Sequence, residues 1–269
     1  MKRILPFLVL IALTVTACIS CNDDKDKTAD TDNSAAIKPP AVMDYNVLKT
    51  YPHDPSSFTE GLFLLNGFLY EGTGENGKSR LLKAELETGK IIQKVDLDKT
   101  YFGEGISMIN NKIYQATWQE HKVFVYDMNF KKIGEFEWPY EGWGMTTDGK
   151  SLIMDTGGSN IYFINPETFK IERTLGVSDN NGYVDSINEL EYVDGYLYAN
   201  IWQTEYIIKI NIQTGLVEAK ADMIDLHRKA NLTAPSADHF LNGIAYDSAK
   251  KSFYITGKNW PTMFEVRFN

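Results

Sequence analysis

Short runs of alternating apolar and polar residues recur along the chain, separated by turns rich in Asn, Asp and Gly. Alternation with a period of two is typical of half-buried strands, and these turn residues favour tight hairpins. One pattern occurs five times, as FLYEGTG, KIYQATW, SLIMDTG, YLYANIW and SFYITGK. Each copy follows a strand that ends in a hairpin turn and precedes a third strand, so the sequence repeats a unit of consecutive strands.

The repeated unit predicts an all-β fold, a five-bladed β-propeller. Its copies recur with a period of about 40 to 50 residues, which is typical of propeller blades. A fourth strand follows in the first four copies, but the fifth copy stops at Asn269 without one. Residues 45–52, YNVLKTYP, have the pattern of a fourth strand with no blade before it. We expect this strand to complete the last blade and close the ring, which removes two open sheet edges. The five matched copies argue against the alternative, a β-sandwich of similar length.

The N-terminal part of the sequence differs from the repeats in composition. A basic start and the apolar run ILPFLVLIALTV are typical of a secretory leader. The leader ends in VTAC, which resembles the bacterial lipobox and implies cleavage before Cys18 and lipid attachment to it. We therefore expect a signal peptide over residues 1–17, a lipid-anchored flexible tether over 18–40 and the propeller over 41–269. This predicts an exported protein anchored in the bacterial cell envelope, in the periplasm or at the outer membrane.

Charge and composition exclude several classes of function. The formal net charge of −9 and the absence of a basic cluster argue against nucleic-acid binding. The only cysteines are Cys18 and Cys21, so no disulfide framework or thiolate metal cage is available. The sequence has no Ser-centred nucleophile elbow. The histidines show no paired spacing for a metal, and we expect neither a metal nor another cofactor. They are His53, which we interpret as a structural hydrogen-bonding residue, and His121, His227 and His239.

Residues that break the strand pattern stand at equivalent places in the repeats. In a propeller, the innermost strands line the central channel, and the loops that enter them form one face. The first strands begin with polar or aromatic residues that we expect to converge at one channel mouth: Glu60, Glu104, Trp143, Asn188 and Asn242. The ends of the second strands add Trp118, Trp202, Lys258 and Trp260. A polar centre with aromatic walls is typical of a small ligand pocket.

Four segments carry a resemblance to a known family: YPHDPSSFTEGL, FGEGI, NELEYVDGYLYANIW and FLNGIAYDSAKKSFYITGKNWP. They resemble the glutaminyl-peptide cyclotransferases of the plant and bacterial type, in the right order over residues 45–269. The resemblance implies a five-bladed propeller enzyme that acts without a metal. Such an enzyme converts the N-terminal glutamine of a peptide or protein to pyroglutamate and releases ammonia. Apart from this resemblance, we expect the protein to be a monomer that contacts the membrane through its lipid anchor alone.

The resemblance also implies roles for single residues. Glu104, in YFGEG, resembles the catalytic glutamate, which takes a proton from the attacking amine and returns one to the departing ammonia. We expect Gly103 and Gly105 beside it to let the substrate backbone approach. Lys258 and Asn188 resemble polar site residues that stabilise the negative charge on the attacked carbonyl oxygen. The sequence leaves open which of the two faces that oxygen.

Aromatic residues complete the expected pocket. Trp118, Trp143 and Trp202 stand at the family's aromatic positions and would exclude water from the site. Phe58 and Phe102 also match the family, although buried loop anchors would have the same pattern. We interpret Trp138 and Trp260 as structural. The segment 222–240 should hold a short helix and a loop, which either rim the pocket or decorate the surface.

Glu60 departs from the family pattern, which usually has glutamine in this place. A second carboxylate near Glu104 should make the two groups titrate together. It either tunes the acid/base residue or weakens substrate binding. Two other readings stay open at this point. A glycosidase would use Glu60 and Glu104 as its pair of carboxylates, and a non-catalytic envelope propeller would bind peptides without reaction.

Overall fold

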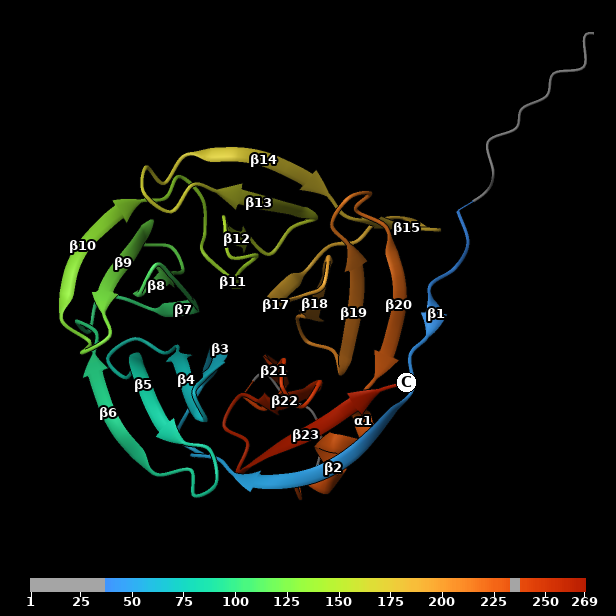
Figure 1. The fold of residues 1–269 in the computed structure, drawn as a ribbon, viewed down its shortest axis with the longest axis horizontal. Coiled ribbons are helices and arrows are strands. Elements are labelled where there is room, and N and C mark those ends of the chain that lie inside the picture. The colour runs from blue at the N-terminus through green and yellow to red at the C-terminus, as the bar shows by residue number, and fades with distance from the viewer. Residues whose placement is uncertain (1–36, 233–237) are drawn as a thin grey trace, which may run out of the picture. The chain divides into compact units, whose positions relative to one another are not determined.

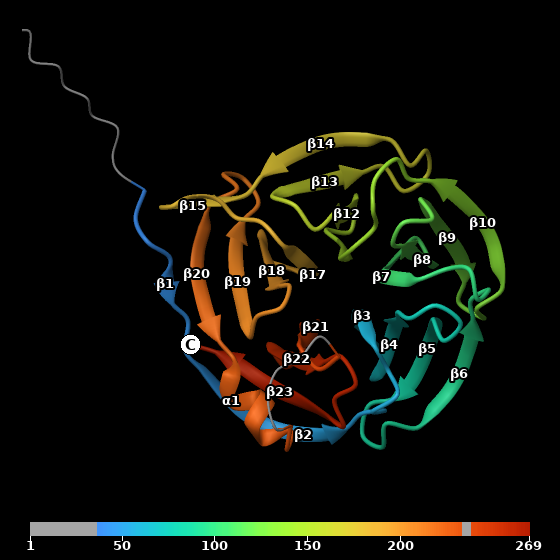
Figure 2. The ribbon, with the colours of Figure 1, turned by 180° about the vertical axis from the view of Figure 1, so that it is seen from behind.

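The computed structural model describes residues 37–232 and 238–269, and nearly all the regular structure in these residues is β. Figures 1 and 2 show the strands from the two sides of the ring, as five sheets around a central axis. The predicted five-bladed β-propeller is therefore confirmed. The predicted leader, Cys18 and most of the predicted tether lie outside the described residues.

The first three sheets each contain four antiparallel strands that follow one another in the sequence. The first sheet holds β3 (Thr59–Leu65), β4 (Phe68–Thr73), β5 (Arg80–Glu85) and β6 (Ile91–Asp96). The second sheet holds β7 (Gly103–Ile109), β8 (Lys112–Thr117), β9 (Lys122–Asp127) and β10 (Lys132–Glu137). The third sheet holds β11 (Met145–Thr147), β12 (Leu152–Asp155), β13 (Asn160–Ile164) and β14 (Ile171–Gly176). In each sheet the first strand is innermost in the ring (Figure 1).

The last two sheets each include a strand from the N-terminal side of the propeller. The fourth sheet holds β17 (Ile187–Val193), β18 (Tyr196–Ile201), β19 (Tyr206–Asn211), β20 (Val217–Asp222) and β1 (Ala41–Val42), which pairs with β20 in parallel. The fifth sheet holds β21 (Leu241–Asp247), β22 (Ser252–Gly257), β23 (Thr262–Phe268) and β2 (Tyr45–Pro52). Strand β2 pairs antiparallel with β23 along its whole length and occupies the outer edge of that sheet. The sequence did not predict β1, because two exposed residues carry no alternation.

Tight hairpins join the first two strands of most sheets, as the turn residues predicted. The backbone is left-handed at Asn66–Gly67, Asn110–Asn111 and Asp194–Gly195, with φ between 48° and 88°. Two consecutive residues with positive φ are the conformation of a type I′ turn, which matches the twist of the flanking strands. In these three sheets, the Asn, Asp and Gly residues therefore place the innermost strand directly beside the second strand.

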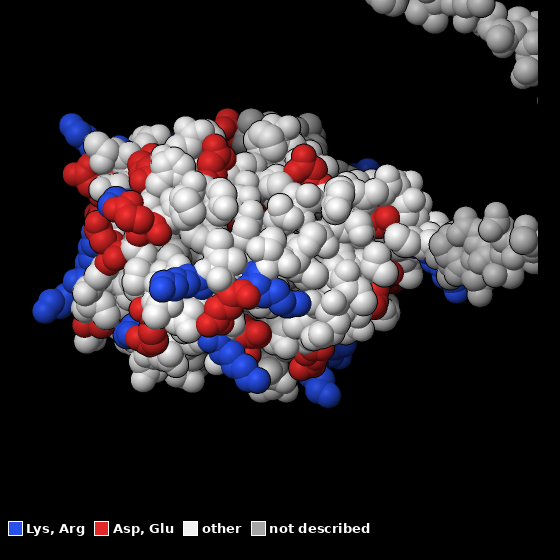
Figure 3. Space-filling model, turned by 90° about the horizontal axis from the view of Figure 1, so that it is seen from above, with Lys and Arg blue, Asp and Glu red and all other residues white. Residues whose placement is uncertain are grey.

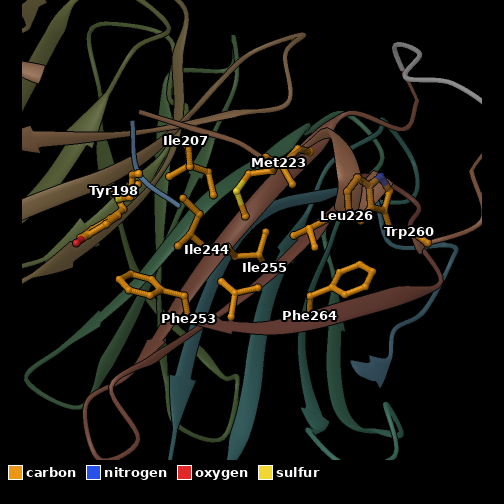
Figure 4. Packing of buried hydrophobic residues seen from close by; sticks show 14 of the residues in the cluster. Tyr198, Ile207, Met223, Leu226, Ile244, Phe253, Ile255, Trp260 and Phe264 are labelled. Carbon is orange, nitrogen blue, oxygen red and sulfur yellow. The ribbon is translucent and has the colours of Figure 1, made fainter. Parts of the chain in front are cut away.

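The apolar core of the described residues lies between neighbouring sheets. It consists of five clusters, one at each of the five interfaces around the ring. Figure 4 shows part of the cluster between the fourth and fifth sheets, where Ile207 and Tyr198 face Ile244, Phe253 and Ile255. Fully burying a large apolar side chain stabilises a fold by about 1.5–3 kcal/mol. Each sheet therefore depends on both neighbours, and the ring holds the loops at its channel mouth in fixed positions.

Two short segments lie outside the regular sheets. A small hairpin pairs β15 (Ser178–Asp179) with β16 (Gly182–Tyr183). Helix α1 (Ile224–Lys229) confirms the short helix predicted in the segment 222–240, and its buried Leu226 joins the cluster of Figure 4. No helix among the described residues is long and apolar enough to cross a membrane. On the side of the ring in Figure 3, acidic and basic side chains are interspersed.

Candidate active site

One pocket at the mouth of the central channel brings together the residues that the sequence singled out. Its volume is about 200 Å³. This is below the range of about 300–1,000 Å³ that is common for drug-sized ligands, and it suits a ligand about the size of one amino-acid residue. The pocket is lined by all nine predicted site residues: Phe58, Glu60, Phe102, Glu104, Trp118, Trp143, Asn188, Trp202 and Lys258.

The antiparallel order of the strands explains why these residues meet. Glu60, Glu104 and Asn188 stand at or near the first residues of the innermost strands β3, β7 and β17. Trp118, Trp202 and Lys258 follow the last residues of the second strands β8, β18 and β22. Since the first strand of a hairpin begins where the second strand ends, both sets lie on one face of the ring.

The polar site residues lie where the innermost strands leave regular pairing. The register with the second strand shifts between Thr59 and Gly61, Gly103 and Ile106, Ile187 and Leu190, and Leu241 and Ile244. Glu60, Glu104, Asn188 and Asn242 fall within these four β-bulges. A bulge inserts an extra residue, bends the strand and redirects a side chain. The bulges thus place polar side chains in a channel mouth where a regular strand would have continued its alternation.

The glycines beside Glu104 do not serve the purpose expected from the sequence. A Cβ atom on Gly105 would lie 2.3 Å from the carbonyl oxygen of Trp143, and one on Gly103 would lie 2.7 Å from the carbonyl oxygen of Thr73. The Gly105 N–H also donates to the Trp143 carbonyl at 2.8 Å. The expectation that these glycines admit the substrate backbone is therefore wrong. They admit neighbouring backbone, because Gly103 lies too close to the end of β4, and Gly105 too close to the segment that enters β11, for a side chain.

A buried ion pair joins two of the predicted site residues. Lys258 Nζ donates to Glu60 Oε1 at 2.6 Å, and the two side chains are 6% and 2% exposed. Asn242 Nδ2 donates to Glu60 Oε2 at 3.0 Å. The Lys258 ammonium also lies 4.3 Å from the centre of the Phe58 ring. Burial raises the pKa of Glu60, while the charge and hydrogen bond of Lys258 and the hydrogen bond from Asn242 oppose that shift.

Glu104 is the pocket carboxylate without such a partner. The residue is 6% exposed, and no described residue donates a hydrogen bond to its carboxylate. Burial is the main cause that raises the pKa of Glu104 well above its ordinary value, and the negative charge of Glu60 adds to it. Lys258 opposes the shift, whereas Asp155 and Glu141 reinforce it. A carboxyl group whose pKa is raised in this way is a better proton acceptor than a free glutamate and can also return the proton.

Aromatic side chains form the wall of the pocket. Phe58 contacts Phe102 edge to face at 6.1 Å between ring centres, and Phe102 contacts Trp118 at 5.6 Å. Trp143 contacts Trp202 edge to face at 5.6 Å. Trp202 is 42% exposed and forms the rim. Such pairs stabilise one another beyond their area burial and leave an apolar surface around the polar centre.

The residues interpreted as structural lie away from the pocket lining. Trp138 and Trp260 are 1% and 0% exposed and belong to two of the apolar clusters. His53 is buried, with Nδ1 2.7 Å from the Trp260 carbonyl oxygen and Nε2 3.2 Å from Glu71 Oε1. A carbonyl and a carboxylate both accept, so both ring nitrogens donate. His53 thus connects the start of the ring to its last sheet.

Two acidic residues beside the pocket were missed by the sequence analysis. Asp155, the last residue of β12, is fully buried, and burial raises its pKa well above the ordinary value. In the repeat it aligns with Ala116 and Asn200, two residues before the position of Trp118 and Trp202, so the feature that marked these tryptophans did not mark Asp155. Glu141 precedes Gly142 and Trp143, and its setting next to a glycine resembles that of Glu104. The described residues contain no group of three or more His, Cys, Asp or Glu side chains that could hold a metal ion.

Comparison with known proteins places this chain in a family. The family model of glutamine cyclotransferases matches residues 12–268. The protein belongs to the glutamine cyclotransferase family. It is 35% identical over 229 residues to the glutaminyl-peptide cyclotransferase of Arabidopsis thaliana, a match that covers 84% of this chain and 72% of that protein. The span matched by the family model includes every residue of the pocket.

A solved structure of a glutaminyl cyclase has the same fold. The crystal structure of Myxococcus xanthus glutaminyl cyclase matches this protein with a TM-score of 0.79 and 30% sequence identity. The match covers 86% of this protein and 98% of that one. The predicted resemblance to the glutamine cyclotransferases is therefore confirmed at the level of family and fold.

Proposed function

We propose that this glutamine cyclotransferase converts the N-terminal glutamine of peptides and proteins to pyroglutamate and releases ammonia. The observation that carries the proposal is the single pocket in which Glu104 stands buried among the other eight predicted site residues. The pocket is small enough to favour one residue, and its mouth on the open face of the ring leaves the rest of a peptide outside. This geometry fits a reaction confined to the first residue of a peptide.

The reaction needs a group that moves a proton, and Glu104 is our candidate. The lone pair of the substrate α-amine attacks the γ-carbonyl carbon of the glutamine and forms the C–N bond of the new ring. The amine then gives up a proton, and the original amide C–N bond breaks as its nitrogen gains one and leaves as ammonia. Because burial and the negative charge of Glu60 raise the pKa of Glu104, its carboxyl group holds a proton more readily than a free glutamate does, and one group can perform both transfers.

Lys258 is our candidate for stabilising the negative charge on the attacked carbonyl oxygen. Its ammonium lines the pocket and is fixed from one side by Glu60 at 2.6 Å. An ammonium group has three donor hydrogens, so the ion pair leaves donors for a substrate oxygen. A fixed cation in a site shielded from water stabilises developing negative charge without reorganisation during the reaction. Asn188 Oδ1 is a buried acceptor without a partner among the described residues. It is suited to accept a hydrogen bond from the substrate amine. This assignment leaves Lys258 as the donor to the attacked carbonyl oxygen.

The aromatic wall would exclude water and hold the aliphatic part of the glutamine side chain. Trp118, Trp143 and Phe102 surround the polar centre, and Trp202 forms the exposed rim. Excluding water strengthens the interaction of Lys258 and Glu104 with the reacting atoms. It also favours attack by the amine over attack by water, so the expected product is pyroglutamate rather than glutamate.

The other two readings of the sequence are less well supported. A glycosidase needs two carboxylates that act on the substrate, whereas Glu60 is occupied by Lys258 and Asn242. A propeller that binds peptides without reaction would have little use for a buried Glu104 to which no described residue donates a hydrogen bond. Membership in the glutamine cyclotransferase family also favours the enzyme.

Ammonia release from a dipeptide that begins with glutamine tests the proposed function. We expect ammonia and the cyclised peptide in equal amounts, measured by a coupled ammonia assay and by mass spectrometry. The matched control is the same dipeptide with an acetylated amino group, which removes the nucleophile and should not react. A chromogenic glycoside tests the rival activity. Absence of ammonia from the unblocked dipeptide, or hydrolysis of the glycoside, would contradict the proposal.

For the location of the protein, we propose a lipid anchor at Cys18 and a position in the bacterial cell envelope. The support is the leader-like sequence followed by VTAC and by the charged, Pro-ended tether of residues 22–40. We propose further that the propeller acts as a monomer. Replacing Cys18→Ala should release the protein from the membrane fraction or block its processing. A mature, membrane-bound Cys18→Ala protein would reject the anchor.

A further inference from the structure

The aromatic wall of the pocket consists of two groups of rings, and the junction between the two groups has no ring contact in the described part of the chain. Phe58, Phe102 and Trp118 form one continuous series of contacts, and Trp143 and Trp202 form another. Between Trp118 and Trp143 there is no ring contact among the described residues. The two indoles come from different parts of the ring, since Trp118 follows β8 and Trp143 precedes β11. Something other than ring packing must therefore hold them as one surface.

The carboxylate of Glu141 occupies this junction. Its Oε2 atom accepts a hydrogen bond from Trp118 Nε1 at 2.9 Å and a second from Trp143 Nε1 at 3.1 Å. Its Oε1 atom accepts from Gln119 Nε2 at 3.0 Å. One oxygen thus binds both indoles of the wall, and the other oxygen is fixed by the residue next to Trp118. Hydrogen bonds to an ionised acceptor are about twice as strong as neutral ones.

The backbone that carries Glu141 is itself fixed. Its carbonyl oxygen accepts from Trp138 Nε1 at 3.1 Å, and Trp138 is buried in the cluster between the second and third sheets. The next residue, Gly142, donates to the carbonyl oxygens of Thr117 and Trp118. A Cβ atom on Gly142 would lie 2.6 Å from the Thr117 oxygen, so only glycine permits this approach. The carboxylate therefore has a rigid base beside the end of β8.

We propose that Glu141 is a positioning residue, which holds the indoles of Trp118 and Trp143 as one closed wall of the pocket. The inference rests on the proposed function, because the wall matters for catalysis only if a substrate glutamine must be held against Glu104. Misplacing a bound substrate by about 1 Å can reduce a rate by a factor of about a hundred. Glu141 does not line the pocket and so acts through the two indoles.

The charge of Glu141 provides a second, independent readout. Burial works to raise the pKa of Glu141, but hydrogen bonds from Gln119, Trp143 and Trp118, together with the charge of His121, keep it below the ordinary value. The group is therefore ionised at neutral pH, and its charge is one of the causes that raise the pKa of Glu104. The other charged or titratable groups that act on Glu104 are Glu60, Lys258 and Asp155.

The test compares Glu141→Ala, Glu141→Gln and the control Glu218→Gln, which changes an exposed glutamate of β20. The first readout is the set of five indole N–H resonances in the full-length protein labelled with ¹⁵N, one from each tryptophan. Trp118→Phe and Trp143→Phe variants assign the two relevant peaks. In Glu141→Ala, we expect both peaks to shift and their hydrogen exchange to accelerate at least about tenfold, since each N–H loses a charged acceptor. The Trp260 peak should stay in place, because Trp260 is buried in the cluster between the fourth and fifth sheets.

The second readout is catalysis of a peptide that begins with glutamine. We expect kcat/KM of Glu141→Ala to fall at least about tenfold, because the wall loses two hydrogen bonds to a charged group. Glu141→Gln keeps an acceptor oxygen and should lose less activity. Its pH–rate profile should shift toward lower pH, since removing a negative charge lowers the pKa of Glu104. Glu218→Gln should change neither quantity.

The outcomes separate this inference from the proposed function. If the chemical shifts of the two indole peaks change no more in Glu141→Ala than they do in Glu218→Gln, the inference is wrong. It is also wrong if the peaks shift while kcat/KM stays within about twofold of the unmodified protein. Should Glu141→Ala fail to fold, Glu141→Gln answers the same questions, with smaller peak shifts and a displaced pH profile as the expected result. If the unmodified protein lacks activity, the proposed function fails, and the indole resonances alone decide whether Glu141 holds the wall.

Discussion

The buried ion pair between Glu60 and Lys258 gives a prediction about stability that can be worked out in detail. Lys258→Met keeps the approximate length of the residue but removes the ammonium that lies 2.6 Å from Glu60 Oε1. Because Glu60 is 2% exposed, its carboxylate would be left in the interior without a counter-ion. Breaking a buried pair from one side costs about 3–5 kcal/mol. That is a large fraction of the roughly 5–15 kcal/mol by which natural domains are stable.

The cost of Lys258→Met should depend on pH. Burial already raises the pKa of Glu60, and Lys258 is the strongest influence against that shift. Without Lys258 the folded-state pKa of Glu60 rises further above its value in the unfolded protein. Below that folded-state pKa, Glu60 takes up a proton and the destabilisation decreases. The loss of stability should therefore be larger at pH 8 than at pH 5.

A double-mutant cycle with Glu60→Gln measures the pair directly. Urea unfolding at both pH values gives the free energy of unfolding for the unmodified protein, each single variant and the double variant. The double variant should be more stable than the sum of the single changes predicts, by at least about 1 kcal/mol. The control Lys94→Met, at an exposed ion pair, should stay within about 0.5 kcal/mol. Additive single changes, or an equal loss at both pH values, would refute the reasoning.

Three further predictions concern the pocket and the ring. Glu60→Gln should leave an active enzyme whose pH–rate profile lies at lower pH, since the charge that it removes is one that raises the pKa of Glu104; an unmoved profile would contradict this. Deleting residues 41–52 removes β2, the strand that pairs with β23, and should unfold the propeller or lower its melting temperature; an unchanged melting temperature would disprove the closure of the ring by this strand. Glu189→Ala leaves two buried backbone N–H groups of neighbouring innermost strands without their acceptor. It should reduce the free energy of urea unfolding by about 2–6 kcal/mol, and a loss below about 1 kcal/mol would contradict this account.

The architecture could be predicted because its signals are local in the sequence. Alternation, hairpin residues such as Asn66–Gly67 and a recurring order of strands are each visible within one repeat. The boundaries of β2 match the predicted 45–52 for the same reason. The two-residue strand β1 has no such signal, because its pairing with β20 depends on backbone contact alone.

The residues that line the pocket could be predicted from the sequence, but the contacts between them could not. The repeat identified which positions face the channel mouth, and the resemblance to a family identified the residue types. Lys258 and Glu60 are 198 residues apart, so their pairing depends on how the last sheet meets the first. The purpose of Gly105 likewise depends on the neighbouring Trp143 backbone, which no local pattern reveals. Glu141 was missed because its partners are indole N–H groups, whose direction depends on the rotamers of the tryptophans.

The most direct test of the central claim is the turnover of a peptide that begins with glutamine by Glu104→Gln. The variant keeps the shape of the residue but cannot take up the proton of the amine. General acid and base groups supply about a hundred- to ten-thousand-fold in rate. We therefore predict that kcat falls at least about a hundredfold while KM changes little. A Glu104→Gln enzyme that keeps more than about a tenth of the normal rate, beside an inactive Glu60→Gln enzyme, would show that Glu104 is not the catalytic carboxylate.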